Sequence, residues 1–401
     1  MPKHTSNDPD RISSSIASVL PEIVSLRHHL HQHPELSHQE AETSALVASR
    51  LRDIGMDSVT TNVGGYGVIG TLAGTGSAST NKTIALRADM DALPIQETRD
   101  VPYRSCKAGV MHACGHDGHT STLLGTAAVL AGMRDLFTGS VRFLFQPAEE
   151  TVGGAWRMCE EGAVDGVDAI VALHGWPGME VGRIGVRSGP MMASSDTFDL
   201  VIRGRGAHAA QPHNSVDPIV VGAHIVTAFQ SVASREMSPT ESVVVTVAQF
   251  HSGTASNIIP DVAELKGTIR CLTEAHRDEI PERLERIAAG VCAAFRANYE
   301  LVFRRGTPVT VNDDAVNLLV SGVGRDVLGD ENVVTLETPS MGAEDFAMYL
   351  QRVPGAMFRL GVGKEMTPLH TPTYNFADEA LPVGMELFTR TVMRFLAEPK
   401  F

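Results

Sequence analysis

The chain contains the stretch Met111-His112-Ala113-Cys114-Gly115-His116-Asp117-Gly118-His119, in which a cysteine and three histidines lie close together. Cys114 and His116 are two positions apart, so on an extended segment their side chains face the same side. Thiolate and imidazole bind borderline-soft divalent cations, and a thiolate can bridge two of them. The stretch therefore predicts a metal site. For this pair taken alone, the alternative is a buried free cysteine beside a hydrogen-bonded histidine.

Further residues of metal-binding type follow apolar runs elsewhere in the chain. They lie in Gln146-Pro147-Ala148-Glu149-Glu150, Leu173-His174-Gly175 and Leu369-His370-Thr371-Pro372. In open α/β sheets, ligands bind outside the carboxyl ends of the strands, so one shared pocket explains the repeated placement. A metal amidase needs one carboxylate as ligand and a second as general base, and Glu149 and Glu150 supply such a pair. The pattern does not say which is which, and acidic residues at a helix N-terminus are a compatible reading.

Alternating apolar strands and amphipathic helices predict an α/β fold, a mixed-sheet catalytic domain with helices on both faces. The middle of the chain has the order β-α-β-β-α-β, which is typical of a ferredoxin-like unit. Its predicted elements span 196–203, 216–235, 242–250, 262–270, 276–296 and 299–304. We therefore expect a discontinuous catalytic domain, 1–187 and 303–401, with an inserted domain at 188–302.

Three weaker patterns carry more than one reading. Gly65-Tyr66-Gly67-Val68-Ile69-Gly70 matches a dinucleotide-binding pattern, but the sequence continues as strand and turn, so we interpret it as a hairpin. His208, in a glycine-flanked loop, is either solvated or placed to polarise a carbonyl group. Arg270, at the end of an apolar strand, is either a surface residue or a clamp for a carboxylate.

Composition excludes several classes of partner. The net charge is −14 and no basic stripe is present, which argues against nucleic acid. No apolar run approaches the roughly 20 residues that span a membrane. The N-terminus is polar and lacks the apolar core of a signal peptide, so we expect a cytoplasmic protein. Five widely spaced cysteines without a C-x-x-C pair argue against a disulfide framework.

Taken together, these motifs resemble the di-metal aminoacylase and carboxypeptidase superfamily. The similarity is to its branch of hippurate hydrolase, N-acyl-amino-acid amidohydrolases and auxin-conjugate (IAA-amino acid) hydrolases. It covers nearly the whole chain and extends to three more segments: Leu30-His31-Gln32-His33-Pro34-Glu35-Leu36, Arg87-Ala88-Asp89-Met90-Asp91-Ala92-Leu93-Pro94 and Met341-Gly342-Ala343-Glu344-Asp345-Phe346.

The resemblance implies two divalent metal ions per subunit, zinc or manganese, with cobalt or nickel as alternatives. It implies ligands at Cys114 (bridging), His116, Glu150, His174 and His370. It further implies Glu149 as general base and acid, His208 as the oxyanion-binding histidine, and substrate contacts at Asn257, Arg270, Met341 and Gly342. Other branches have His-x-Asp where this chain has Arg87-Ala88-Asp89, so a ligand is absent there and Asp89 is expected to support the site indirectly.

The expected function is metal-dependent cleavage of N-acyl-L-amino acids, such as hippurate or acetyl-amino acids, to a carboxylate and a free amino acid. The resemblance also implies that the insert is a lid through which a homodimer or higher homo-oligomer forms. A di-metal dipeptidase or carboxypeptidase is the enzymatic alternative. A catalytically silent metal-binding scaffold is the alternative of another class, and the presence of Glu149 argues against it.

Overall fold

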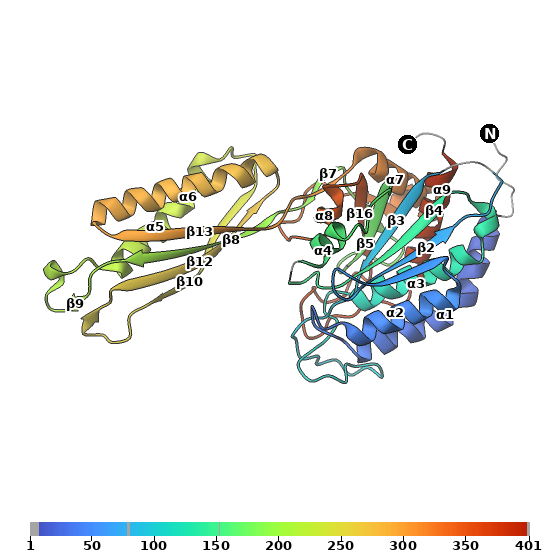
Figure 1. Cartoon of the computed structure of the whole chain (residues 1–401), viewed down its shortest axis with the longest axis horizontal. Helices are drawn as coiled ribbons and strands as arrows, with labels where there is room; N and C mark the ends of the chain where they lie inside the picture. Colours follow the sequence, from blue (N-terminus) through green and yellow to red (C-terminus); the bar gives the residue numbers. More distant parts are fainter. Residues whose placement is uncertain (1–7, 78–80, 152, 399–401) are drawn as a thin grey trace. The chain divides into compact units, whose positions relative to one another are not determined.

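The computed structural model describes residues 8–77, 81–151 and 153–398 (Figure 1). The chain divides into two compact units. One comprises Met1–Gly189, Val311–Glu337 and Asp345–Phe401, and the other Pro190–Thr310 and Thr338–Glu344. The predicted boundary at 302 falls inside a strand, β13 (Asn298–Thr307), which continues to the end of the second sheet.

The first unit contains an eight-stranded mixed sheet with the order β1-β2-β4-β3-β5-β16-β6-β15. Its central strands β4, β3, β5 and β16 run parallel, whereas β1 pairs antiparallel with β2 and β2 with β4. β6 pairs antiparallel with β16 and parallel with β15. The antiparallel pairing of β1 with β2 confirms the hairpin interpretation of the 65–70 glycines. The strands are β1 (Ser58–Val63), β2 (Gly67–Ala73), β3 (Thr83–Asp89), β4 (Ser140–Gln146), β5 (Ala169–Trp176), β6 (Ile184–Val186), β15 (Val333–Thr335) and β16 (Gly355–Gly361).

Helices cover both faces of this sheet, as predicted. Alternate strand residues such as Leu86, Leu173 and Leu360 join the main hydrophobic core with the helices of one face. Two short helices pack on the opposite face, against β4 and β16 (Figure 1). The helices that pack on the core face are α1 (Asp8–Gln32), α3 (His116–Ala131), α7 (Asp314–Leu328) and α9 (Ala380–Ala397), with α2 (Ala41–Ile54) beside β1 and β2. The two short helices are α4 (Gly154–Glu160) and α8 (Ala347–Leu350).

The second unit contains a four-stranded antiparallel sheet with the order β10-β12-β8-β13. Two helices pack on it, and their N-termini are capped by Asp217 and Thr273, whose side-chain oxygens accept backbone N–H hydrogen bonds. The chain order is the predicted β-α-β-β-α-β, with a small β9–β11 pair in addition. Its elements are β8 (Ser195–Arg203), β9 (Ala207–His208), α5 (Pro218–Ser231), β10 (Val243–Ser252), β11 (Ile258–Ile259), β12 (Val262–Cys271), α6 (Glu274–Phe295) and β13.

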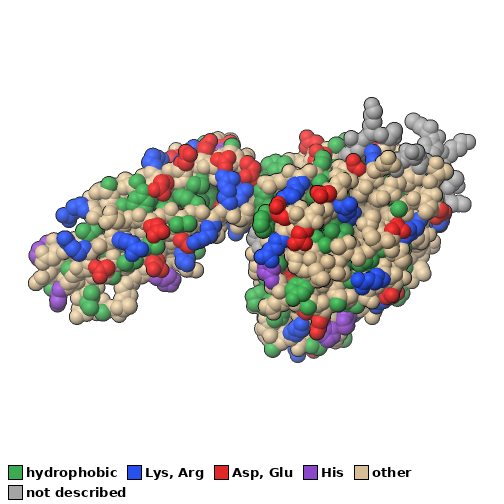
Figure 2. Space-filling model, viewed as in Figure 1, with side chains coloured by type: hydrophobic (Ala, Val, Ile, Leu, Met, Phe, Trp, Pro, Cys, Tyr) green, Lys and Arg blue, Asp and Glu red, His purple; other side chains and the backbone are tan. Residues whose placement is uncertain are grey.

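The surface is mixed in charge. On the face in view, acidic and basic side chains are interspersed, with no broad basic area (Figure 2). Among the described residues, every helix is too short or too polar to cross a lipid bilayer. All five cysteines are free, and Cys159, Cys271 and Cys292 are buried.

Candidate metal centre

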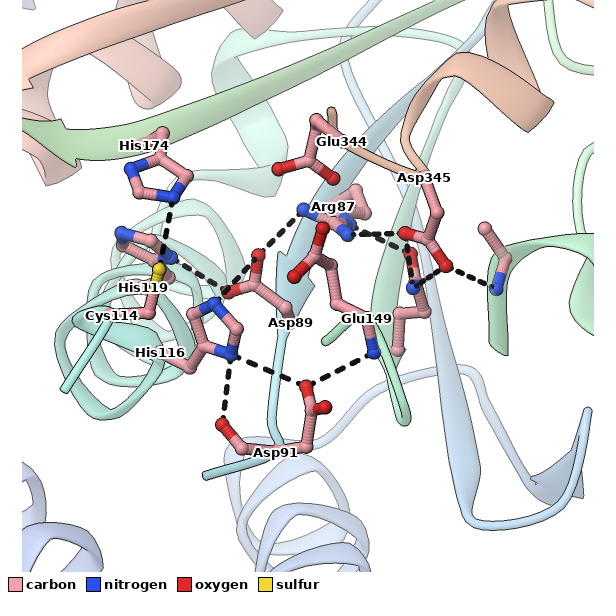
Figure 3. Close-up of polar contacts among 12 residues, drawn as sticks. Arg87, Asp89, Asp91, Cys114, His116, His119, Glu149, His174, Glu344 and Asp345 are labelled. Carbon is pink, nitrogen blue, oxygen red and sulfur yellow. Dashed lines mark hydrogen bonds and ion pairs between the residues drawn. The ribbon is translucent and has the colours of Figure 1, made fainter. Parts of the chain in front are cut away.

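The ends of three parallel strands and the start of one helix form the candidate site. β3 ends at Asp89, β4 leads into Glu149 and Glu150, and β5 carries His174 near its end. α3 begins at His116, two residues after Cys114 (Figure 3). Since neighbouring parallel strands end at the same edge of a sheet, segments far apart in the sequence converge there.

The structure brings all five predicted ligands together. Their potential ligand atoms and those of Glu149 form three sets, and the atoms within each set lie within 4.8 Å of one another. The sets are Cys114, His116 and His174; Cys114, Glu150 and His370; and His116, Glu149 and Glu150. The Cys114 Sγ is 3.5 Å from His174 Nε2, and Glu150 Oε1 is 3.3 Å from His370 Nε2. Cys114, His116 and Glu150 each belong to two of these sets, so the sets form one continuous cluster.

Hydrogen bonds fix which imidazole nitrogens can accept a cation. Nδ1 of His116 lies 2.8 Å from the carbonyl oxygen of Asp91, and Nδ1 of His174 lies 2.9 Å from that of Gly175. A carbonyl oxygen only accepts, so both Nδ1 atoms carry a proton, which leaves Nε2 as the atom of each ring that can bind a cation. Within the described part of the chain, the buried His116 Nε2 has no hydrogen-bond partner, and Glu150 Oε1 faces the Nε2 atoms of His370 and His116 at 3.3 and 3.9 Å. Thiolate, imidazole and carboxylate donors arranged in this way fit divalent cations such as zinc.

A strained turn positions the two adjacent glutamates. The backbone N–H groups of Glu149 and Glu150 donate to the two carboxylate oxygens of Asp91, at 3.1 and 3.0 Å. The preceding Ala148 has a φ of 52°, a left-handed conformation that costs energy for a residue with a side chain. Its N–H donates to Glu40 Oε1 at 2.8 Å, which holds the turn in place. Sequence reasoning gave no role to Asp91 or Glu40, because neither bond is local.

Asp89 is engaged through both oxygens beside the cluster. Oδ2 accepts from Arg87 Nη1 and Oδ1 lies against His119 Nδ1, both at 2.7 Å (Figure 3). Nε2 of His119 accepts the N–H of Gly175 at 2.8 Å, so His119 is neutral and links Asp89 to the residue after His174. His119 lies inside the quoted motif, but only the fold shows this bridging position.

The converging carboxylates perturb the ionisation of the cluster. Burial, reinforced by the charges of Glu150 and Glu149, raises the pKa of the Cys114 thiol. Burial would lower the pKa of His116, but the neighbouring carboxylates, Asp89 foremost, raise it to about 10. A divalent cation reverses both tendencies, because its charge favours the thiolate and the neutral imidazole. The electrostatics of the cluster thus match those of a metal site.

The second unit carries the remaining predicted residues at two places. His208, on β9, pairs with Ile258, and the Asn257 carbonyl accepts the N–H of Ala209 at 3.0 Å. This loop adjoins the Val262 end of β12, whereas Arg270 lies at the other end, roughly 26 Å away along the strand. Within one copy of this unit, Arg270 and Asn257 therefore lie near opposite ends of the strand, and their contact with a substrate stays a prediction.

Met341 and Gly342 belong to the 338–344 segment of this second unit. The Gly342 carbonyl accepts the N–H of Ala193 at 2.9 Å, and its own N–H donates to Ser340 Oγ. Gly342 is exposed and Met341 is half-buried. The segment is thereby fixed beside β7 (Gly189–Met192), through an isolated bridge between Met192 and Ser340.

Comparison with known proteins agrees with this description. A family model described as peptidase family M20/M25/M40 matches residues 85–394. The N-acetylcysteine deacetylase of Bacillus subtilis is 40% identical over 368 residues, covering 91% of this chain and 94% of the relative. Thermostable carboxypeptidase 2 of Saccharolobus solfataricus is 38% identical over 383 residues, covering 94% and 95%. A crystal structure from Bacillus subtilis, described as a dinuclear metal binding peptidase from the M20 family, superposes with a TM-score of 0.84 at 35% identity and covers 95% of this chain and 99% of that one.

Proposed function

The chain belongs to peptidase family M20/M25/M40, a family of hydrolases, and on that premise we propose that it is a metal-dependent amidohydrolase acting on N-acyl-L-amino acids. The products would be a carboxylate and a free amino acid. The convergence of five ligand-type side chains beside Glu149 is the observation that carries the proposal. The similarity to a deacetylase of an N-acyl amino acid supports this choice of substrate class.

Cys114, His116, Glu150, His174 and His370 would hold two divalent ions, with zinc or manganese as the proposed metals. When bound, such ions polarise the amide carbonyl and lower the pKa of water. Glu149 would take a proton from the attacking water and later deliver it to the nitrogen of the leaving amine. His208 of the second unit would donate a hydrogen bond to the developing oxyanion, an interaction worth roughly 3 kcal/mol.

A substitution of Glu149 by glutamine tests the assigned base. We expect Glu149→Gln to keep the metal content of the wild type and to lower kcat on hippurate and N-acetyl-amino acids by about 10²–10⁴-fold. Glu22→Gln, on the exposed surface of α1, is the matched control and should change neither quantity. Full activity with bound metal would show that Glu149 is not the base, whereas loss of metal would make it a ligand instead.

A di-metal carboxypeptidase is the second candidate, because the similarity to the thermostable carboxypeptidase is nearly as high as that to the deacetylase. Both readings use the same metal cluster and differ in the acyl group. Acetyl-, benzoyl- and peptidyl-amino acids that share one leaving amino acid separate them. Faster turnover of the peptidyl substrate would favour the carboxypeptidase.

We also propose a homodimer formed through the second unit. The edge strand β10 exposes Phe250, and the start of α5 exposes Ile219 and Val220. Within one copy, residues at the two ends of β12 lie too far apart to contact the same substrate. In a dimer, the two ends could each contact a different substrate. Light scattering of the wild type and of Val220→Asp tests this: a dimer that becomes a monomer is expected, and a wild-type monomer would refute it.

A further inference from the structure

An arginine and a tryptophan lie beside the candidate metal centre on the polar face of the sheet. β16 runs parallel to β5, with Arg359 paired in register with His174. Trp176 is two residues after His174, so the three side chains project from the same face. The Trp176 ring centroid is 5.8 Å from that of His174, and the guanidinium carbon of Arg359 is 3.6 Å from the Trp176 ring centroid. The guanidinium is therefore no more than about 9.4 Å from the His174 ring.

Unlike three buried arginines of the chain, the half-buried Arg359 has no acidic partner among the described residues. Arg27, Arg87 and Arg277 are buried, and each forms an ion pair with at least one aspartate. Arg359 makes no ion pair with any described residue, and its buried Nε has no hydrogen-bond partner among them. The chain has 47 acidic and 33 basic residues, so the missing partner does not reflect a shortage of carboxylates.

The stack on Trp176 suits the guanidinium to bind an anion. The guanidinium carbon lies 3.6 Å from the ring centroid, and a guanidinium stacked on an aromatic face keeps the edge that carries its N–H groups available for hydrogen bonds. This geometry matches a carboxylate, which can accept two parallel hydrogen bonds from the guanidinium. Burial lowers the pKa of Arg359 to about 10, which leaves it charged at neutral pH, and a bound anion would offset the cost of burying that charge.

We propose that Arg359, held by Trp176, forms a carboxylate-binding subsite next to the metal centre and selects substrates that carry a carboxylate in addition to the scissile amide. The inference rests on the proposed amidohydrolase function. The carboxylate could be the α-carboxylate of the amino acid, a carboxylate on its side chain, or one at the far end of the acyl group. The chemistry of recognition is the same in the three cases.

Fluorescence tests binding without any catalysis. The chain has two tryptophans, so Trp156→Phe leaves Trp176 as the single emitter. Metal-free protein of this variant is titrated with succinate at constant ionic strength, with chloride as the control anion. We expect a saturable change in Trp176 emission that Arg359→Lys weakens at least tenfold and Arg359→Gln abolishes. Identical titrations with and without Arg359 would overturn the proposal, even if the enzyme proved to have another activity.

Kinetics then identifies the source of the carboxylate. Three substrate pairs differ by one charge: N-acetylglutamate and N-acetylglutamine, N-acetylalanine and its amide, and succinylalanine and butyrylalanine. If the subsite binds the α-carboxylate, Arg359→Gln should raise KM at least tenfold for every substrate except the amide of N-acetylalanine. If it binds a side-chain or acyl carboxylate, only N-acetylglutamate or only succinylalanine should be affected. Arg325→Gln, at an exposed arginine, should change none of the six. Equal losses on every substrate would reduce Arg359 to a structural role. Absence of activity on all six would count against the proposed function and leave the fluorescence result standing.

Discussion

Replacing His31 by asparagine should destabilise the first unit strongly at low pH and little at high pH. His31 is fully buried between two carboxylates: Nδ1 is 2.9 Å from Asp117 Oδ2 and Nε2 is 3.2 Å from Glu97 Oε1. Asp117 follows His116 directly and also pairs with Arg27 at 3.3 Å. The imidazolium thus ties α1 to the segment that carries the metal-binding motif.

The size of this pH-dependent destabilisation follows from the pKa of His31. Burial alone would lower it, but the charges and hydrogen bonds of Asp117 and Glu97 raise it from 6.5 to about 9. Each unit of difference between the folded and unfolded states corresponds to about 1.4 kcal/mol, so the protonated state stabilises the fold by about 3 kcal/mol. Because the folded pKa is the higher one, this contribution is complete below about pH 6.5 and is lost as the pH rises through about 9.

Urea unfolding of the metal-free protein provides the assay. Both tryptophans, Trp156 and Trp176, lie in the first unit, so their fluorescence reports on the unit that contains His31. Wild type and His31→Asn should differ in free energy of unfolding. The pH-dependent part of this difference should be about 3 kcal/mol near pH 6 and a few tenths of a kcal/mol near pH 9.5. His213→Asn, at an exposed position of the second unit, is the control. A difference that stays constant across this range would refute the assigned charge on His31.

Three further outcomes are expected. Asp91→Asn weakens the anchor of the two glutamates and should lower metal affinity about 10–100-fold in a chelator competition. Gly118→Ala places a methyl group 2.4 Å from the Phe376 ring and should lower stability by about 1–3 kcal/mol. Gly290→Ala in α6 is the control: no atom lies within 4 Å of the added methyl group, so stability should rise by up to about 1 kcal/mol. Thermal melts measure both changes. Chelation should lower Tm, and added zinc or manganese should restore it.

Much of the fold could be predicted from local patterns. Strands such as β4 and β5 are short apolar runs closed by proline or glycine, and the helices of the second unit begin at capping residues. The pairings that depend on distant segments could not be predicted in this way. β15 pairs with β6, and the 338–344 segment belongs to the second unit although it follows α7 of the first. No periodicity in the sequence marks either association.

The candidate site could likewise be predicted from the sequence only in part. The residue types at Cys114, His116 and His174, at the ends of apolar runs, were enough to predict a metal cluster. The groups that orient them depend on hydrogen bonds between remote segments, such as the one from Ala148 to Glu40. Arg359 lies beside His174 only because β16 pairs with β5 in a particular register. Such a register is fixed by the packing of the whole sheet, so the sequence around Arg359 gives no sign of it.

Arg87 stabilises carboxylates beside the candidate site without being a metal ligand itself. Its guanidinium is charged at every accessible pH and pairs with Asp89 and Asp345, so these carboxylates have a permanent counter-charge. Burial alone would raise the pKa of Asp89, but His116 and Arg87 lower it, which keeps the carboxylate available to hold His119.

Cys114 and Glu150 face His174 and His370 instead, whose imidazoles offer no permanent positive charge. Arg87 is not itself a ligand-type residue, but it gives Asp89 a fixed partner whatever the metal content. The bond from Gly175 to His119, and with it the position of His174, then depends on the fold alone, so the first ion would meet a partly organised site.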